Sequence, residues 1–111
     1  MGTTRKTRTG ISTAAATQML EHSADAAALL RALGNEQRLA ILCGLLDGPL
    51  SVSQINERVD LSQSALSQHL AVLRESELVA TRKDAQTVYY SLPDGPARQV
   101  LALLQKIFCP S

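Results

Sequence analysis

Two short helices separated by only a few residues are the feature that most constrains the fold of this chain. Ser51 and Gln54 form a capping-box pattern that begins the first helix, which is expected to end near residue 58. Ser62 can cap the second helix, which runs to residue 75. Leucines at three- and four-residue spacing mark its buried stripe: Leu66, Leu70 and Leu73. The pattern predicts two helices joined by a tight turn.

Three further helices are indicated by the spacing of apolar residues. Residues 18–33 carry leucine and alanine at helical intervals, so they are expected to form the first helix. Asn35 can cap a second helix over residues 36–47, which is apolar nearly all round and is therefore expected to be deeply buried. A Pro-Asp-Gly-Pro break precedes the last helix, at residues 97–108.

A β-hairpin is predicted between residues 78 and 92. Residues 78–83 and 87–92 are β-prone, and the second run alternates apolar and polar side chains. Asp84, Ala85 and Gln86 join the two runs. The expected fold is mainly α-helical with this one small hairpin.

Composition limits the chain to one domain of modest size. Its 111 residues are 45% hydrophobic but only 3% aromatic, so an aliphatic core between helices is expected. Residues 1–17, which include Arg5, Lys6 and Arg8, are predicted to be a mobile basic tail, with a phosphate-contacting arm as the alternative. Residues 18–111 are predicted to form the folded domain. No apolar run is long enough to span a membrane, and a cytoplasmic location without a membrane partner is expected.

Duplex DNA is the partner that the local pattern favours, although the formal net charge of +1 gives little support for it. The helix that begins at Ser62 has polar, uncharged residues on its outer face: Gln63, Ser64, Ser67 and Gln68. His69 beside them is expected to be a helix-packing or a phosphate-facing residue and not a metal ligand. Glutamine can pair with adenine N6 and N7, and serine can reach a base or a phosphate. The hairpin that follows offers further contacts from Arg82, Lys83 and Gln86. A solvated helix face and a solvated turn are the alternatives.

Four runs of the sequence resemble the ArsR/SmtB family of winged-helix repressors. They lie at residues 35–43, 61–70, 73–75 and 86–92, and the resemblance covers about residues 18–109. It implies a winged helix-turn-helix with four helices, two strands and a last helix, in that order. It also implies a homodimer formed through the first and last helices, and a palindromic operator. The last helix supports a dimer independently because it has more apolar residues than a terminal surface helix needs: Val100, Leu101, Leu103, Leu104, Ile107 and Phe108.

Cys43 and Cys109, the two cysteines of the chain, indicate how such a regulator could be switched. The runs around them resemble the persulfide-sensing, BigR/SqrR-like branch of the family, and residues 61–70 and 86–90 are also similar to its HlyU-like regulators. That resemblance implies that a disulfide or polysulfide bridges the two thiols in response to reactive sulfur or an oxidant, and that DNA is then released.

The bridging chemistry requires one thiolate that attacks and a second thiol that resolves the product. Cys109, beside the C-terminus, is expected to attack, and Cys43, in an apolar helix, to resolve. We expect their Cα atoms in the reduced protein to lie farther apart than the roughly 4.4 to 6.8 Å of an unstrained disulfide. The alternative is that Cys43 is a small buried hydrophobic residue and Cys109 a tail thiol without a role.

Two other functions stay open. A metal- or metalloid-responsive repressor would need ligands that the sequence does not offer, because residues 53–58 contain no cysteine and the last helix contains no histidine. No metal or other cofactor is therefore expected. The second alternative is a winged-helix protein-interaction module without DNA affinity. An enzyme is disfavoured because no cysteine, histidine and acid are placed to act together.

Overall fold

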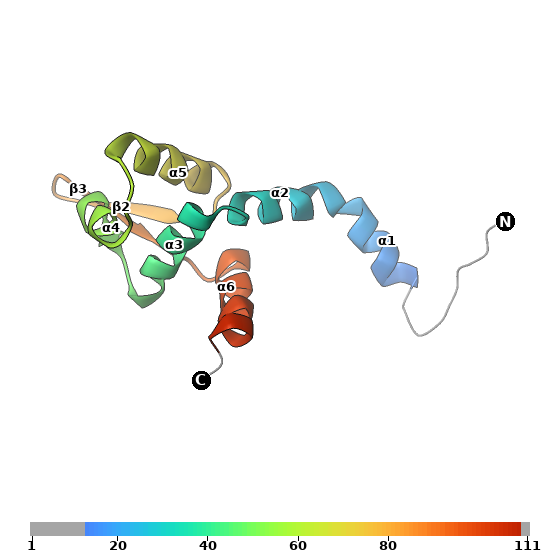
Figure 1. Cartoon of the computed structure of the whole chain (residues 1–111). Coiled ribbons are helices and arrows are strands. Elements are labelled where there is room, and N and C mark those ends of the chain that lie inside the picture. Colours follow the sequence, from blue (N-terminus) through green and yellow to red (C-terminus); the bar gives the residue numbers. More distant parts are fainter. Residues whose placement is uncertain (1–12, 110–111) are drawn as a thin grey trace. The chain divides into compact units, whose positions relative to one another are not determined.

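The computed structural model describes residues 13–109 of the chain (Figure 1). Its elements are α1 (Thr13–Glu21), α2 (Ser23–Leu33), α3 (Glu36–Gly44), the 3₁₀ helix η1 (Leu45–Asp47), β1 (Leu50–Ser51), α4 (Val52–Arg58), α5 (Gln63–Glu75), β2 (Ala80–Asp84), β3 (Thr87–Ser91) and α6 (Pro96–Phe108). The expected fold, mainly helical with a hairpin, is confirmed. The described residues divide into one compact unit up to Leu30 and a second from Arg31 onward. The predicted basic tail lies mostly outside the described residues.

The first predicted helix is divided in two at His22, and α1 begins at Thr13, inside the segment predicted as a tail. The Ser23 hydroxyl donates to the carbonyl of Leu20 at 3.0 Å. Serine hydroxyls that bond to nearby carbonyls compete with the regular hydrogen bonds of a helix and bend it. This bond lies at the break between α1 and α2.

The core of the second unit lies between α3, α5 and α6. Asn35 caps α3 as predicted, because its side-chain oxygen accepts a hydrogen bond from the Arg38 amide at 3.0 Å. The helix ends at Gly44, and the last three residues predicted for it form η1 instead. In contrast to the predicted deep burial, only one side of α3 is buried, because Cys43 on this helix is exposed. The largest of the fully buried side chains are aliphatic: Ile41, Leu42, Leu45, Ile55, Leu66, Leu73 and Leu101.

The helix-turn-helix formed by α4 and α5 follows the predicted caps. The Ser51 hydroxyl accepts a bond from the Gln54 amide at 3.2 Å, and the Gln54 side chain accepts one from the Ser51 amide at 2.9 Å. The Ser62 hydroxyl accepts a bond at 3.2 Å from the backbone amide three residues later. In the connection, the Asn56 amide donates to the carbonyl of Leu61 at 3.1 Å. The predicted tight turn is therefore held by its own side chains.

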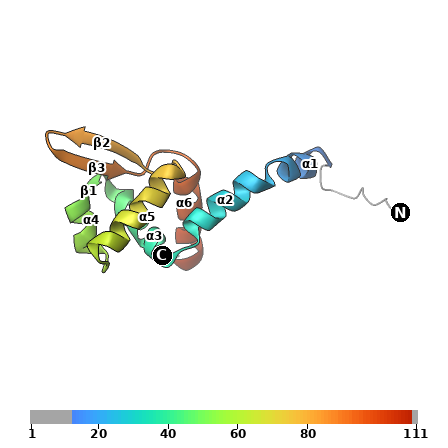
Figure 2. The same cartoon turned by 90° about the horizontal axis from the view of Figure 1, so that it is seen from above.

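The hairpin is confirmed, and a short strand that the sequence did not predict extends its sheet to the order β1-β3-β2. Both pairings are antiparallel, with Leu50 of β1 opposite Tyr90 of β3. The hairpin turn lies at the periphery of its unit (Figure 2). Ala85 in this turn has a φ of 58°, in the left-handed region that costs a residue other than glycine about 1–2 kcal/mol. Among residues 13–109, no helix has the length and apolarity that a bilayer crossing requires.

Candidate nucleic-acid interface and cysteine pair

The outward face of α5 carries the polar side chains that the sequence predicted for it. Gln63, Ser64, Ser67 and Gln68 are all exposed. On the opposite face, the side chains of Leu66, Leu70 and Leu73 are at most 3% exposed and fix the helix to the core. Helix α5 therefore presents uncharged donors and acceptors to solvent while its other side is immobilised by packing.

Ser62 lies at the start of this face, where its hydroxyl oxygen is used to cap α5. The same oxygen is 3.5 Å from the hydroxyl oxygen of Ser64, and both residues are exposed. The first amides of a helix carry partial positive charge, which suits a phosphate placed nearby. Ser62 thus combines a structural role with a position from which it could contact a DNA backbone.

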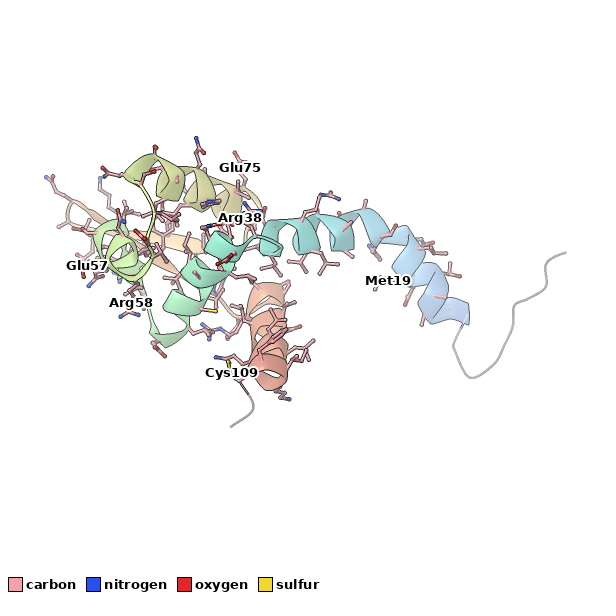
Figure 3. The ribbon with its side chains drawn as sticks, in the orientation of Figure 1. Met19, Arg38, Glu57, Arg58, Glu75 and Cys109 are labelled. Atoms are coloured by element: carbon pink, nitrogen blue, oxygen red, sulfur yellow. The ribbon has the colours of Figure 1, made fainter. Side chains whose placement is uncertain are left out.

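His69 differs from its neighbours because it is half-buried. Its Nδ1 atom lies 3.4 Å from Nη1 of Arg38, a residue of α3. Figure 3 labels Arg38, which lies between the start of α3 and α5. His69 was predicted to be near DNA, but its ring contacts Arg38 of α3.

The hairpin brings Arg82, Lys83 and Gln86 to the surface, as predicted. The Arg82 guanidinium lies 5.5 Å from the centre of the Tyr89 ring and 3.9 Å from the Asp84 carboxylate. Both charged side chains of this ion pair are largely exposed, so the pair adds little stability. The Tyr89 ring gives the guanidinium a preferred orientation while leaving it accessible.

The two cysteines lie at the C-terminal ends of α3 and α6, two helices of the second unit (Figures 1 and 2). Cys43 is the penultimate residue of α3, and Cys109 caps the end of α6 (Figure 3). Both thiols are free and exposed. Cys43 is therefore not the buried hydrophobic residue that the alternative interpretation required.

The pKa of Cys43 is raised above its ordinary value. The larger cause is the partial loss of hydration around its sulfur, although the residue as a whole is exposed. The second cause is repulsion by the Cys109 thiolate, which acts only when the two sulfurs are close enough for their charges to interact. The raised pKa lowers the thiolate fraction of Cys43 at neutral pH, while the Cα separation of the pair stays a prediction.

Arg98 makes two contacts that were not predicted from the sequence. The Arg98 guanidinium donates to the carbonyl of Leu92, just after β3, at 2.6 Å and lies 3.5 Å from the Asp94 carboxylate. It joins the end of the hairpin to α6. The pair with Asp94 has the i,i+4 spacing of a local ion pair, whereas the contact with the Leu92 carbonyl has no local sequence signal. Within residues 13–109, no three His, Cys, Asp or Glu side chains gather where a metal ion could bind.

Comparison with known proteins places this arrangement in a family. The model of the bacterial regulatory proteins of the arsR family matches residues 35–81, which include α3, α4 and α5. The transcriptional activator HlyU of Vibrio cholerae is 52% identical over 92 residues, covering 83% of this chain and 85% of HlyU. The chain belongs to the ArsR family.

Other ArsR-family proteins extend the likeness to the whole fold. A solved structure of reduced HlyU from Vibrio cholerae superimposes with a TM-score of 0.77 at 52% identity, covering 84% of this chain and 98% of that one. The biofilm growth-associated repressor of Xylella fastidiosa is 36% identical over 91 residues, covering 82% of this chain and 80% of its own length. The chain is accordingly a DNA-binding transcriptional regulator and not an enzyme, as the sequence predicted.

Proposed function

We propose that this ArsR-family protein is a repressor that binds a palindromic operator as a homodimer and releases it when Cys43 and Cys109 become bridged. The observation that carries the proposal is the placement of two free, exposed thiols at the C-terminal ends of α3 and α6. A thiol pair within mutual reach can be joined by disulfide or polysulfide chemistry without unfolding the domain.

Sequence reading is assigned to the exposed face of α5. Gln63 and Gln68 each offer a carbonyl acceptor and an amide donor, the combination that pairs with adenine N6 and N7 in the major groove. Ser62, Ser64 and Ser67 supply hydroxyls for bases or phosphates. Arg82, Lys83 and Gln86 at the hairpin would contact the backbone or the minor groove beside the site. His69 is the remaining residue of α5 in the predicted set, and it is half-buried.

The switch is an exchange reaction in which the donor is reduced. With an organic tetrasulfide, the Cys109 thiolate attacks an internal sulfur and expels one thiolate. The Cys43 thiolate then attacks the next internal sulfur and expels a second thiolate, which leaves two sulfurs inserted between the cysteines. With hydrogen peroxide, Cys109 is oxidised to a sulfenic acid, and attack by Cys43 releases water and leaves a disulfide.

The dimer is assigned to the outer sides of the terminal helices. Leu103, Ile107 and Phe108 of α6 are 55%, 56% and 76% exposed, although they are large and apolar. Met19 and Leu20 of α1 are exposed as well. Two copies of the chain would cover such surfaces, and two reading helices would each bind one half-site. A bridge from Cys43 to Cys109 would tie α6 to α3 and change the spacing of the reading helices.

Substituting the outer face of α5 tests the DNA-reading role. We expect Gln68→Ala to weaken operator binding about tenfold and Ser64→Ala to weaken it less, since a bidentate base contact contributes about 1–3 kcal/mol. Duplexes selected from a randomised pool by the wild-type dimer supply the operator, and fluorescence anisotropy measures the affinity. Gln99→Ala, an exposed glutamine of α6, is the matched control and should leave the affinity unchanged. Equal losses in both glutamine variants would contradict the assignment.

A further inference from the structure

Arg38 joins three parts of the second unit through one side chain. Its Nε donates to the carbonyl of Ala32 at 2.6 Å, and its Nη2 donates to the carbonyl of Arg31 at 3.0 Å. Both carbonyls belong to the last turn of α2, which has no helical partner for them. Nη1 lies 3.4 Å from Nδ1 of His69 on α5. The guanidinium thus links the end of α2, the start of α3 and the reading helix.

The contact between Arg38 and His69 is favourable in only one protonation state of the imidazole ring. A guanidinium has only donors and stays charged throughout the ordinary pH range, so the Nδ1 atom must be the acceptor. The hydrogen of a neutral ring then resides on Nε2. A proton added to Nδ1 would remove the acceptor and set two positive charges 3.4 Å apart.

We propose that Arg38 is a positioning residue that holds α5 against the junction of α2 and α3, and that His69 acts through this contact and not by touching DNA. His69 directly follows Gln68, so a movement of α5 at His69 would also displace a side chain assigned to base reading. Arg38 also shares α3 with Cys43, which places the switch thiol and the anchor of the reading helix on one rigid element. The inference rests on the proposed DNA-reading role of α5.

The sign of the pH dependence separates this proposal from a DNA-facing histidine. Protonating a ring that faces phosphate would strengthen DNA binding, whereas protonating a ring that faces Arg38 would weaken it. The side chains one helical turn from His69 on α5, at positions 65, 66, 72 and 73, are uncharged, so they add no charge that would oppose or strengthen the effect of Arg38 on the ring. Of the other charged residues near this junction, Arg31 and Glu36 are exposed, and neither contacts the ring among residues 13–109.

Operator affinity measured between pH 7.5 and 5.5, under reducing conditions, tests the proposal. We expect the wild-type affinity to fall about fivefold on acidification, because a proton on Nδ1 would break the contact with Arg38. His69→Asn keeps an acceptor near the Nδ1 position but cannot titrate, so its affinity should be the same as wild type at pH 7.5 and nearly constant. His22→Asn, at the other histidine, should retain the wild-type pH dependence. Binding that strengthens on acidification in wild type but not in His69→Asn would overturn the proposal.

Removing the Arg38 guanidinium tests the positioning role directly through operator affinity. Arg38→Met should bind about fivefold more weakly at pH 7.5, and its affinity should lack the His69-dependent change with pH. If Arg38→Met does not fold, the His69→Asn comparison decides the matter alone. A folded Arg38→Met with wild-type affinity and wild-type pH dependence would contradict the positioning role.

A readout on the free protein keeps this proposal distinct from the DNA-binding proposal. Nitrogen-15 spectra of the imidazoles at pH 7.5 should show the neutral His69 ring protonated on Nε2, with this preference weakened in Arg38→Met. A ring protonated on Nδ1 would overturn the contact whether or not any duplex binds. Failure of every selected duplex to bind, with the Nε2 form observed, would instead contradict the proposed function.

Discussion

Treating the reduced dimer with an organic tetrasulfide is expected to lower its operator affinity about fiftyfold. The change follows from bridging Cys43 of α3 to Cys109 at the end of α6, which restrains two helices whose thiols are free in the reduced protein. Couplings between a switch and a binding site are typically 5- to 150-fold, that is, about 1–3 kcal/mol. Anisotropy before and after treatment, and again after adding a reductant, measures the loss and its reversal.

Mass spectrometry identifies the bridge. The tetrasulfide should add two sulfur atoms and remove two hydrogens, whereas hydrogen peroxide should only remove two hydrogens. Cys43→Ser and Cys109→Ser are isosteric controls that should form no intrachain bridge and keep their operator affinity under both reagents. Loss of DNA binding by the treated Cys43→Ser variant, or no crosslink with either reagent in wild type, would contradict the switch while leaving DNA recognition intact.

The raised pKa of Cys43 predicts the order of the two steps. A raised thiol pKa lowers the thiolate fraction at neutral pH, and the thiolate is the nucleophile. Cys43 should therefore react with iodoacetamide more slowly at pH 7 than a cysteine in a short peptide, and the deficit should shrink as the pH rises. A transient adduct on Cys109, resolved faster at higher pH, is the expected kinetic pattern. An adduct that appears first on Cys43 would reverse the assigned roles.

Local chemistry made the helix-turn-helix predictable from the sequence. The caps at Ser51, Ser62 and Asn35 act on amides within three residues, so their effect needs no knowledge of the rest of the fold. The buried stripe of α5 follows in the same way from its 3.6-residue period. These features position the reading face, which is why its residues could be named in advance.

Contacts between distant segments set the features that the sequence did not reveal. Strand β1 is only two residues long and exists because Leu50 and Ser51 pair with Tyr90 and Tyr89. The orientation of His69 did have a local signal. It lies three residues after Leu66 and four before Leu73, a spacing that places it beside the buried stripe and not at the centre of the outer face. Its partner, 31 residues away, had none.

A charge on the apolar side of α6 is expected to abolish the dimer and thereby to lower the operator affinity more than a hundredfold. Leu103 and Ile107 are four residues apart on one face of the helix and more than half exposed in the protomer. Ile107→Asp would bury a carboxylate against a second copy without a partner, yet it would disturb little within the protomer. A monomer binds only one half-site and loses the effective concentration that a linked second site provides.

Sedimentation equilibrium at micromolar concentration should therefore find a dimer for the wild type and a monomer for Ile107→Asp, both with the same helical content by circular dichroism. Gln105→Asp introduces the same charge on the same helix, at an exposed position two residues away, and should remain dimeric with wild-type affinity. A wild-type monomer that binds the palindrome fully, or an Ile107→Asp dimer, would exclude this face as the interface. If Ile107→Asp is monomeric but still bridges Cys43 to Cys109, the thiol reaction belongs to the single protomer and the dimer only converts it into release of DNA.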